Sequence, residues 1–218
     1  MIQFEGVTVR KGQKLVLDAV SFRVEEGQKA VFRGKSGAGK SSVLLALAGA
    51  LTPAAGTVRF NGVPVDATTV QTVRSELAFV AQEPVLGAET IREALLLPFT
   101  FRAHRQRQPA EEDLKQLLVT LALDPEILDR ESAVVSGGEK QRVAVGRALL
   151  LGKRVFLADE VTSALDPESR SILLDIFSRP ELTVLSVSHD EEWTRRCDRV
   201  FEVDAGAVSE LEPETGGA

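Results

Sequence analysis

Glycine, lysine and hydroxyl residues gather in one short segment whose chemistry suits phosphate. The segment follows the pattern G-x-x-x-x-G-K-[ST], between the apolar run 30–32 and the helix-like run 42–48. Glycines let backbone N–H groups surround a small anion, and a following helix directs its positive dipole end at the same point. We therefore predict a phosphate-binding loop, in which Lys40 reaches the outer phosphates and Ser41 binds Mg²⁺. A glycine-rich turn that matches the pattern by accident is the alternative. The predicted loop residues are Gly34, Lys35, Ser36, Gly37, Ala38, Gly39, Lys40, Ser41 and Ser42.

Two adjacent acids, Asp159 and Glu160, end the apolar run 155–158. α/β folds bind ligands at the carboxyl edge of the sheet, and beyond the end of a strand both side chains can turn towards one site. Asp159 is suited to the Mg²⁺ shell, usually through water, and Glu160 to the base that orients or deprotonates an attacking water. A merely solvated acid pair is the alternative. Together with a phosphate loop, a metal and a base are what phosphoryl transfer requires.

A second glycine-containing segment also precedes a helical pattern. Ser136, Gly137 and Gly138 are followed by Glu139 and by the amphipathic run 143–151. The glycines give close access, and the N-terminus of the helix can face an anion. Ser-x-x-Glu is also a capping box, so an ordinary helix start is the alternative.

The elements that must position these residues follow an α/β pattern. The first third contains short β segments separated by glycines, and the spacing from about residue 83 to 151 is helical. The last third alternates apolar runs with amphipathic stretches, which indicates βαβ units on a parallel sheet. The acidic residues after Gly206 are expected to be loosely held. The predicted strands are 2–9, 15–24, 29–32, 57–60, 154–158, 182–187 and 200–203, and predicted helices include 111–121, 167–177 and 190–196.

Composition limits the class of protein. With 218 residues, 44% of them hydrophobic, the chain can form one substantial core, alone or with an appended subdomain. The one cysteine, Cys197, cannot form an internal disulfide, and the absence of a signal-like start favours the cytosol. No apolar run approaches the length of a membrane span. The net charge of -6 argues against nucleic acid as a partner. The short basic segment 102–107 is expected to be solvated, with contact to lipid headgroups or an acidic partner as the alternative.

The loop at Ser136 resembles the signature loop of ABC-type ATPases, which usually reads Leu-Ser-Gly-Gly-Gln. Other family motifs follow in order: Gln82 matches the Q-loop, the segment 163–166, ending at Asp166, matches the D-loop, and His189 matches the H-loop. The resemblance covers essentially the whole chain. It implies a P-loop NTPase fold with a RecA-like core, an N-terminal antiparallel β subdomain and an α-helical insert. In one ABC ATPase domain, 1–218, the core and β subdomain would comprise 1–82 and 153–218, and the helical subdomain 83–152.

The same resemblance implies the ligands and the assembly. ATP and Mg²⁺ would be the cofactors, and two copies would form an ATP-dependent homodimer, head to tail. Each nucleotide would lie between the phosphate loop of one copy and the signature loop of the other, because no single phosphate loop surrounds the γ-phosphate. Lys40, Gln82, Glu160 and His189 would be catalytic. Gln82 would also sense Mg²⁺ and link the site to the helical insert, His189 would contact the γ-phosphate, and Asp166 would lie at the nucleotide.

Several positions depart from the family pattern. Val135 replaces the usual Leu, Glu139 replaces Gln, and Val161 stands where Pro commonly follows the two acids. Family members carry an aromatic residue near the end of the first strand to stack on the base, whereas this chain has no tyrosine and places Arg10 or Lys11 there. Since a guanidinium can stack on a base, we expect weaker or less selective base recognition, not its absence.

The segments 81–86, 97–99 and 159–166 resemble the small ATPase subunits of the bacterial FetA (YbbL) type, a group described as the motor of an iron exporter. This implies an integral membrane permease docked near Gln82 and the helical insert, and a peripheral location on the cytoplasmic face of the cell membrane. An ABC engine that transmits force to a membrane complex without moving a solute stays open. A nucleic-acid-linked ABC ATPase is disfavoured by the acidic charge. The predicted docking residues, which could instead form the core of the insert, are Leu95, Leu96, Leu97, Phe99 and Phe101.

Overall fold

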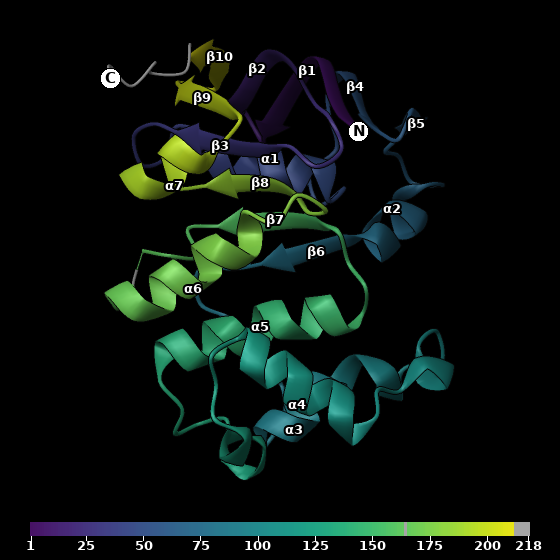
Figure 1. Ribbon diagram of the computed structural model, residues 1–218. Coiled ribbons are helices and arrows are strands. Elements are labelled where there is room, and N and C mark those ends of the chain that lie inside the picture. Colours follow the sequence, from purple (N-terminus) through teal and green to yellow (C-terminus); the bar gives the residue numbers. More distant parts are fainter. Residues whose placement is uncertain (164, 212–218) are drawn as a thin grey trace. The chain divides into compact units, whose positions relative to one another are not determined.

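A computed structural model of the chain describes residues 1–163 and 165–211 (Figure 1). These residues form two compact units. The first unit comprises residues 1–79, 154–160 and 177–211, and the second comprises 80–153 and 161–176, apart from residue 164. The phosphate loop and the acids Asp159 and Glu160 belong to the first unit, whereas Gln82 and the signature loop belong to the second.

The first unit contains two β-sheets. The antiparallel sheet has the order β2-β1-β4-β5, and the larger sheet has the order β10-β9-β3-β8-β7-β6. Within the larger sheet β3 pairs in parallel with β8 and β9, and β7 pairs in parallel with β8, so the carboxyl ends of these strands meet at one edge. The strands are β1 (Ile2–Lys11), β2 (Lys14–Val24), β3 (Lys29–Arg33), β4 (Ala55–Phe60), β5 (Val63–Pro64), β6 (Leu77–Val80), β7 (Val155–Asp159), β8 (Thr183–Val187), β9 (Arg199–Asp204) and β10 (Ala207–Leu211).

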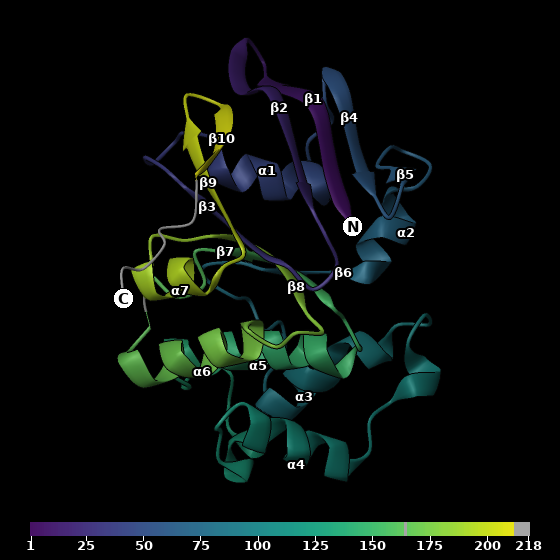
Figure 2. The same ribbon diagram turned by 45° about the horizontal axis from the view of Figure 1, so that its top comes forward.

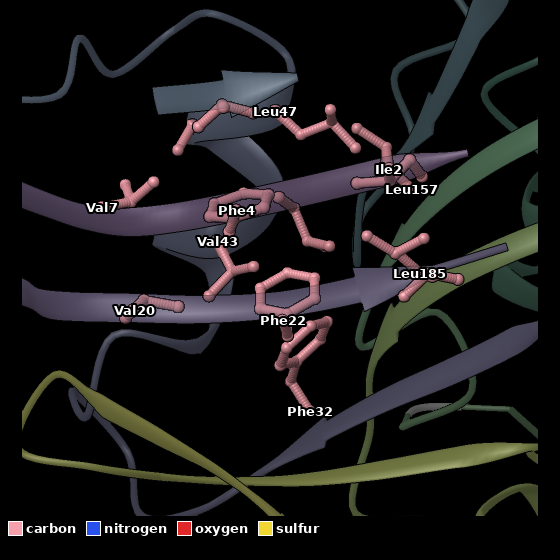
Figure 3. Close-up of a cluster of buried hydrophobic side chains, with 14 of the residues drawn as sticks. Ile2, Phe4, Val7, Val20, Phe22, Phe32, Val43, Leu47, Leu157 and Leu185 are labelled. Carbon is pink, nitrogen blue, oxygen red and sulfur yellow. The ribbon is translucent and has the colours of Figure 1, made fainter. Parts of the chain in front are cut away.

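A continuous hydrophobic core joins both sheets to helix α1 (Lys40–Leu47) (Figure 3). The ring of Phe22 stacks on Phe4 at a centroid distance of 4.5 Å and meets Phe32 edge-on at 5.2 Å. Val43 and Leu47 of α1 are fully buried in the same cluster. Such close-packed aromatic and aliphatic contacts fix an element firmly. The helix that begins at the phosphate loop is therefore held by the core. The other helices of this unit are α2 (Val70–Glu76) and α7 (Glu191–Arg196).

The end of the first unit corrects the prediction of a loosely held tail after Gly206. Ala207–Leu211 forms strand β10, which pairs antiparallel with β9 in a hairpin (Figure 2). Val208 packs against the core. Side chains alternate between the two faces of a strand, so a strand that packs on one face only can carry polar residues at the positions between. Residues 212–218 of the same predicted tail lie outside the described residues. Helix α2 and strand β10 are both absent from the predicted elements.

The second unit consists mainly of helices, and its longest helix is α5. Gly146 lets the end of α4 approach α5, because a Cβ atom there would lie 2.5 Å from the Leu121 side chain. The buried guanidinium of Arg142 donates to the carbonyl oxygens of Leu121 and Ala122 at 3.2 and 3.0 Å. These contacts fix the helix that follows the signature loop. The helices are α3 (Ile91–Leu96), η1 (Leu97–Thr100), η2 (Arg105–Arg107), α4 (Glu111–Thr120), η3 (Pro125–Asp129), α5 (Gly137–Leu150) and α6 (Pro167–Phe177).

The structure divides the five apolar residues that were predicted to form a docking surface. Leu95 and Phe99 are buried, Leu96 and Leu97 are half-buried, and Phe101 is exposed. Leu95 lies on the same face of α3 as the buried Ile91, one turn earlier. The prediction of an exposed cluster is therefore wrong for Leu95 and Phe99, which are core residues.

Candidate functional site

The phosphate loop connects β3 to α1, and two of its glycines are needed where the backbone passes close to neighbouring strands. Gly34 has φ +133° and Gly39 has φ +114°. A Cβ atom would lie 2.1 Å from the Val203 carbonyl oxygen at Gly34 and 2.5 Å from the Val16 carbonyl oxygen at Gly39. Both the backbone angle and the lack of space exclude larger residues. The sequence pattern therefore reflects a tightly folded loop.

The N-terminus of α1 is free to bind an anion. Gly39 is its N-cap residue, no side chain caps it, and its first turn contains no acid. The first N–H groups of a helix have no partner within the helix, and together with the dipole they attract negative charge. An uncapped helix start behind a glycine-rich loop is the arrangement that binds phosphate.

Lys40 is buried and its ammonium group lies within the loop. Its Nζ donates to the carbonyl oxygens of Gly34 at 2.8 Å and of Lys35 at 3.1 Å. These bonds hold a positive charge at the start of α1, where a third donor of the ammonium group stays available. A bound phosphate would accept a hydrogen bond from this group and add the attraction between two opposite charges.

The hydroxyl of Ser41 and the carboxylate of Asp159 meet beside the loop. Ser41 Oγ donates to Asp159 Oδ1 at 2.8 Å. Burial raises the pKa of Asp159, the bond from Ser41 lowers it, the charge of Glu160 raises it and Lys40 lowers it, with a net increase. A half-buried carboxylate whose charge is disfavoured by burial would be stabilised by a cation. Oxygen ligands of this kind suit Mg²⁺. Within residues 1–163 and 165–211, no group of three or more His, Cys, Asp or Glu residues is placed to hold a metal ion.

Glu160 directly follows strand β7 in the left-handed region, with φ +50°. Its backbone N–H donates to the Val187 carbonyl oxygen at 2.9 Å, which fixes the turn. A non-glycine residue with positive φ is uncommon, and such backbone strain collects at functional sites. The turn directs the chain so that Asp159 bonds to Ser41 while Glu160 lines the same hollow as the phosphate loop. The structure thus brings both acids to the loop.

A hollow of about 490 Å³ lies over the phosphate loop. Its volume falls in the range of small-molecule sites. Of the two residues predicted near the base, Lys11 lines the hollow, whereas Arg10 is exposed on β1 and is not part of the lining. His189 is exposed and follows β8 at the carboxyl edge of the sheet. The lining residues are Lys11, Lys14, Leu15, Val16, Ser36, Gly37, Ala38, Gly39, Lys40, Ser41, Ser42, Glu160, Ala205 and Gly206.

The second unit holds the remaining predicted residues. Gln82 is exposed, and its Nε2 donates to Ser163 Oγ at 3.2 Å, which links the predicted Q-loop to the start of the predicted D-loop. Ala164 of that segment lies outside the described residues. Asp166 Oδ1 accepts from the Ser169 N–H at 2.9 Å at the start of α6. Hydrogen bonds from Ser169 lower the pKa of the exposed Asp166 carboxylate.

The signature loop begins α5 with a complete capping box. Ser136 Oγ accepts from the Glu139 N–H at 3.2 Å, and the Glu139 carboxylate accepts from the Ser136 N–H at 2.7 Å. Gly137 has open space around it, whereas a Cβ atom at Gly138 would lie 2.5 Å from Ser169 Oγ. Val135, the departure from Leu, is buried. The segment is therefore a capped helix start, as the alternative interpretation predicted. Gly137 also leaves room for a ligand to approach the same turn.

Comparison with known proteins agrees with this geometry. The family model described as "ABC transporter" matches residues 17–163. The chain is 31% identical over 220 residues to "Probable iron export ATP-binding protein FetA" of Escherichia coli, covering 98% of the chain and 96% of that protein. The chain belongs to the ABC transporter family. It is an ATP-binding subunit of that family and hydrolyses ATP, with the RecA-like core, antiparallel β subdomain and helical insert predicted.

A longer relative and a solved structure are also similar to this ABC ATPase. "Mycobactin import ATP-binding/permease protein IrtB" of Mycolicibacterium thermoresistibile is 35% identical over 96% of the chain, which spans only 37% of that protein. The solved structure titled "Dimeric structure of a post-hydrolysis state of the ATP-binding cassette MJ0796 bound to ADP and Pi" has a TM-score of 0.83 at 26% identity, with complete coverage of both chains. In the described part of this ABC ATPase, no helix is long and apolar enough to cross a bilayer.

The structure adds residues to the site that the sequence patterns did not single out. Ala205 and Gly206, in the turn between β9 and β10, line the hollow. The Gly206 N–H donates to the Ala38 carbonyl oxygen of the phosphate loop at 3.0 Å, and the Gly206 carbonyl oxygen accepts from the Asp18 N–H at 2.9 Å. A D-A-G turn between two apolar alternating segments is a hairpin signal that could have located them.

Proposed function

We propose that this ABC ATPase powers the export of a metal ion, iron, through a separate membrane permease. The similarity to FetA, which is named as an iron export ATP-binding protein, extends over 98% of the chain and 96% of that protein. IrtB joins an ATP-binding part to a permease part in one protein, which supports a permease as the partner here. The chain would then be peripheral on the cytoplasmic face of the cell membrane.

The observation that carries the catalytic part of the proposal is the convergence of four groups on one hollow: the uncapped start of α1, Lys40, the Ser41–Asp159 pair and Glu160. The loop N–H groups and Lys40 bind the phosphates of ATP. Ser41 and Asp159 would hold Mg²⁺, and Gln82 is the further ligand that the family resemblance implies. That ion, when bound, neutralises charge on the phosphates.

Glu160 orients or deprotonates the water that attacks the γ-phosphate. A carboxylate base of this kind contributes roughly 10²–10⁴ in rate. Its backbone is held in the left-handed region by the bond to Val187, which places the residue in the lining of the hollow over the phosphate loop. His189 contacts the γ-phosphate and holds the geometry of the attacking water.

A second copy of the chain completes the ATP-binding site. The hollow over the phosphate loop is open, and the loop supplies donors from one helix start only. Ser136, Gly137 and Gly138 of the other copy add a second helix N-terminus, and Asp166 lies beside them. The dimeric state of MJ0796 supports this assembly. ATP then joins the two copies and hydrolysis releases them.

We also propose how the domain is divided into subdomains and where the permease docks on it. The chain is one ABC ATPase domain, with its core and β subdomain in 1–82 and 153–218 and its helical subdomain in 83–152. Within the second unit, the Gln82–Ser163 hydrogen bond couples Gln82 to the segment that precedes Asp166, which supports a role for Gln82 in linking the site to the helical subdomain. The permease docks near Gln82 and the helical subdomain, and the exposed Val85 offers apolar contact area.

The decisive experiment on the site is the substitution Glu160→Gln. The amide keeps the shape of the side chain but cannot act as a base, so the variant binds ATP and stays in the dimeric state. Gel filtration with ATP and Mg²⁺ is expected to show a stable dimer. The double variant Glu160→Gln with Lys40→Ala is the control and should elute as a monomer. Elution of Glu160→Gln itself only as a monomer would contradict the assignment.

The cargo is tested separately. The chain is purified from its source membranes with its associated membrane protein, and that pair is reconstituted into vesicles. ATP-dependent loss of iron from the side carrying the ATPase is the expected result. An ATPase pair that moves another solute instead would overturn the iron proposal and leave the site assignment intact.

A further inference from the structure

A positively charged segment of the second unit contrasts with the acidic chain that carries it. The net charge of the chain is -6, yet residues 94–110 contain no Asp or Glu. Phe101 and four basic residues lie within this stretch, and we refer to residues 101–107 as the basic segment. The basic residues are Arg102, His104, Arg105 and Arg107.

The basic segment is a folded surface feature. The N–H groups of His104 and Arg105 donate to the Phe101 carbonyl oxygen at 3.0 and 3.1 Å, and the Arg107 N–H donates to the His104 carbonyl oxygen at 2.8 Å. Two residues before Phe101, the buried Phe99 anchors the chain in the core of the unit. The positions of the charges are therefore fixed by backbone turns.

The charges of the basic segment are not neutralised within the part of the chain that the structure describes. Arg102, Arg105 and Arg107 are exposed and pair with no carboxylate among those residues. The acids that flank the stretch are already engaged. Glu93 accepts from the Thr90 N–H at 3.2 Å in a capping box, and Glu111 accepts from Arg92 at 2.6 Å. An external anionic partner would supply the missing charge.

The exposed ring of Phe101 indicates which kind of partner. Its exposed fraction is 61%, which is high for an aromatic residue beside ordered backbone. A cationic segment with an exposed aromatic ring is typical of proteins that rest on anionic membranes, where the ring enters the boundary between headgroups and acyl chains. Residues three apart align in a 3-10 helix, so Arg105 and Arg107 point in different directions. Mobile headgroups can meet such divergent charges more easily than a fixed acidic pocket can.

We propose that the basic segment binds the anionic headgroups of membrane lipids. This goes beyond the proposed export function and does not depend on the cargo. Each arginine near an anionic surface strengthens binding about fivefold, so three together contribute about a hundredfold. Binding of this strength does not anchor a protein by itself. The basic segment therefore orients a subunit that its permease also holds.

The test measures partition of the purified chain onto vesicles of equal parts phosphatidylglycerol and phosphatidylcholine by co-sedimentation. The chain is expected to bind these vesicles at low salt, to lose most of the binding at high salt, and to ignore pure phosphatidylcholine. Combined Arg102→Gln, Arg105→Gln and Arg107→Gln substitutions should weaken the partition about a hundredfold. Phe101→Ser should remove the part of the binding that resists salt.

A matched variant controls for net charge alone. Combined Lys115→Gln, Arg154→Gln and Arg195→Gln substitutions remove the same charge from exposed positions elsewhere and should leave the partition almost unchanged. ATPase activity in the absence of lipid confirms that both triple variants are folded, and it also separates this proposal from the assignment of the catalytic site. Equal loss in the two triple variants would overturn the proposal. So would a chain that ignores anionic vesicles but needs the three arginines to bind its permease in detergent, since the partner would then be an acidic protein surface.

Discussion

Two helices of this ABC ATPase follow glycine-containing loops, and their N-termini differ in side-chain capping and in the charge of the first turn. The start of α1 has no capping side chain and no acid in its first turn. The start of α5 is capped by Ser136, and the carboxylate of Glu139 returns to the Ser136 N–H. The start of α1 therefore has no side-chain cap, whereas the start of α5 bonds its Glu139 N–H to its own N-cap side chain.

The difference shows why glycines alone do not define a phosphate site. At α1, Gly34 and Gly39 fold the loop against neighbouring strands, and Lys40 adds a buried positive charge. At α5 the open position is Gly137, and the first turn carries a negative charge instead. The α1 start can bind phosphate alone, whereas in the proposed dimer the α5 start would contribute when another copy brings a nucleotide to it.

The largest expected effect is at the free helix start. Lys40→Ala removes the ammonium group that we propose contacts the phosphates, and charge-assisted hydrogen bonds to such a group are worth about 4 kcal/mol in sum, or about a thousandfold in Kd. Titration calorimetry with ATP measures the loss. Lys115→Ala, an exposed lysine on α4, is the control and should bind ATP normally. Retained ATP affinity in Lys40→Ala would remove the basis of the comparison.

At the capped helix start, Ser136→Ala should separate binding from catalysis. The isolated chain should bind ATP with unchanged Kd, while kcat should fall about a hundredfold, as for loss of one donor to transition-state charge. Loss of the cap should also cost about 1 kcal/mol in unfolding free energy.

Thr90→Ala is the matched control for that variant, because Thr90 and Glu93 form the same capping box at α3. It should lose similar stability but keep full ATPase activity, as measured by denaturant unfolding and phosphate release. If Ser136→Ala and Thr90→Ala lose the same activity, Ser136 acts only as a cap.

The turn at Gly206 offers a third test, of how the free helix start is kept in shape. Gly206 has φ +90°, and a Cβ atom there would lie 2.9 Å from the Val16 carbonyl oxygen. Gly206→Ala should shift the turn, and through the bond to Ala38 it should shift the phosphate loop, raising the Kd for ATP about tenfold.

Gly62→Ala controls for backbone strain, since Gly62 has φ +79° with open space around it. Both substitutions should lower the free energy of unfolding by about 1–2 kcal/mol, because alanine is strained in the left-handed region. Only Gly206→Ala should weaken ATP binding. An unchanged Kd in Gly206→Ala would show that the hairpin does not position the loop.

The parts of the site that the sequence predicted are those where chemistry and spacing are local. The phosphate loop and the Asp159–Glu160 pair each occupy a short run that ends a strand, so their pattern is complete within a few residues. The contribution of Gly206 depends on the pairing of β10 with β9 and on contact with Ala38, which is far away in sequence. No local pattern contains that information.

Burial within the helical unit was predicted less well for a related reason. Leu95, Phe99 and Phe101 are similar in hydrophobicity, yet the first two are buried and the third is exposed. The short helix α3 is an α-helix, whereas η1 is a 3-10 helix with fewer residues per turn. The spacing that predicts the buried face of α3 therefore does not predict the buried face of η1. Packing against neighbouring helices, not hydrophobicity alone, decides which of these residues face the core.

The smallest expected effect is on recognition of the nucleotide base, in contrast to recognition of the phosphates at the start of α1. The hollow is lined there by Lys11, Lys14, Leu15 and Val16, with no aromatic ring, so base recognition should be weak. Competition binding should show ATP and GTP within about tenfold of each other. Lys11→Tyr should strengthen ATP binding by about fivefold or more, because base stacking on an aromatic ring is worth about 1–3 kcal/mol. A thousandfold preference of the natural chain for ATP would show that the base, and not only the free helix start, selects the ligand.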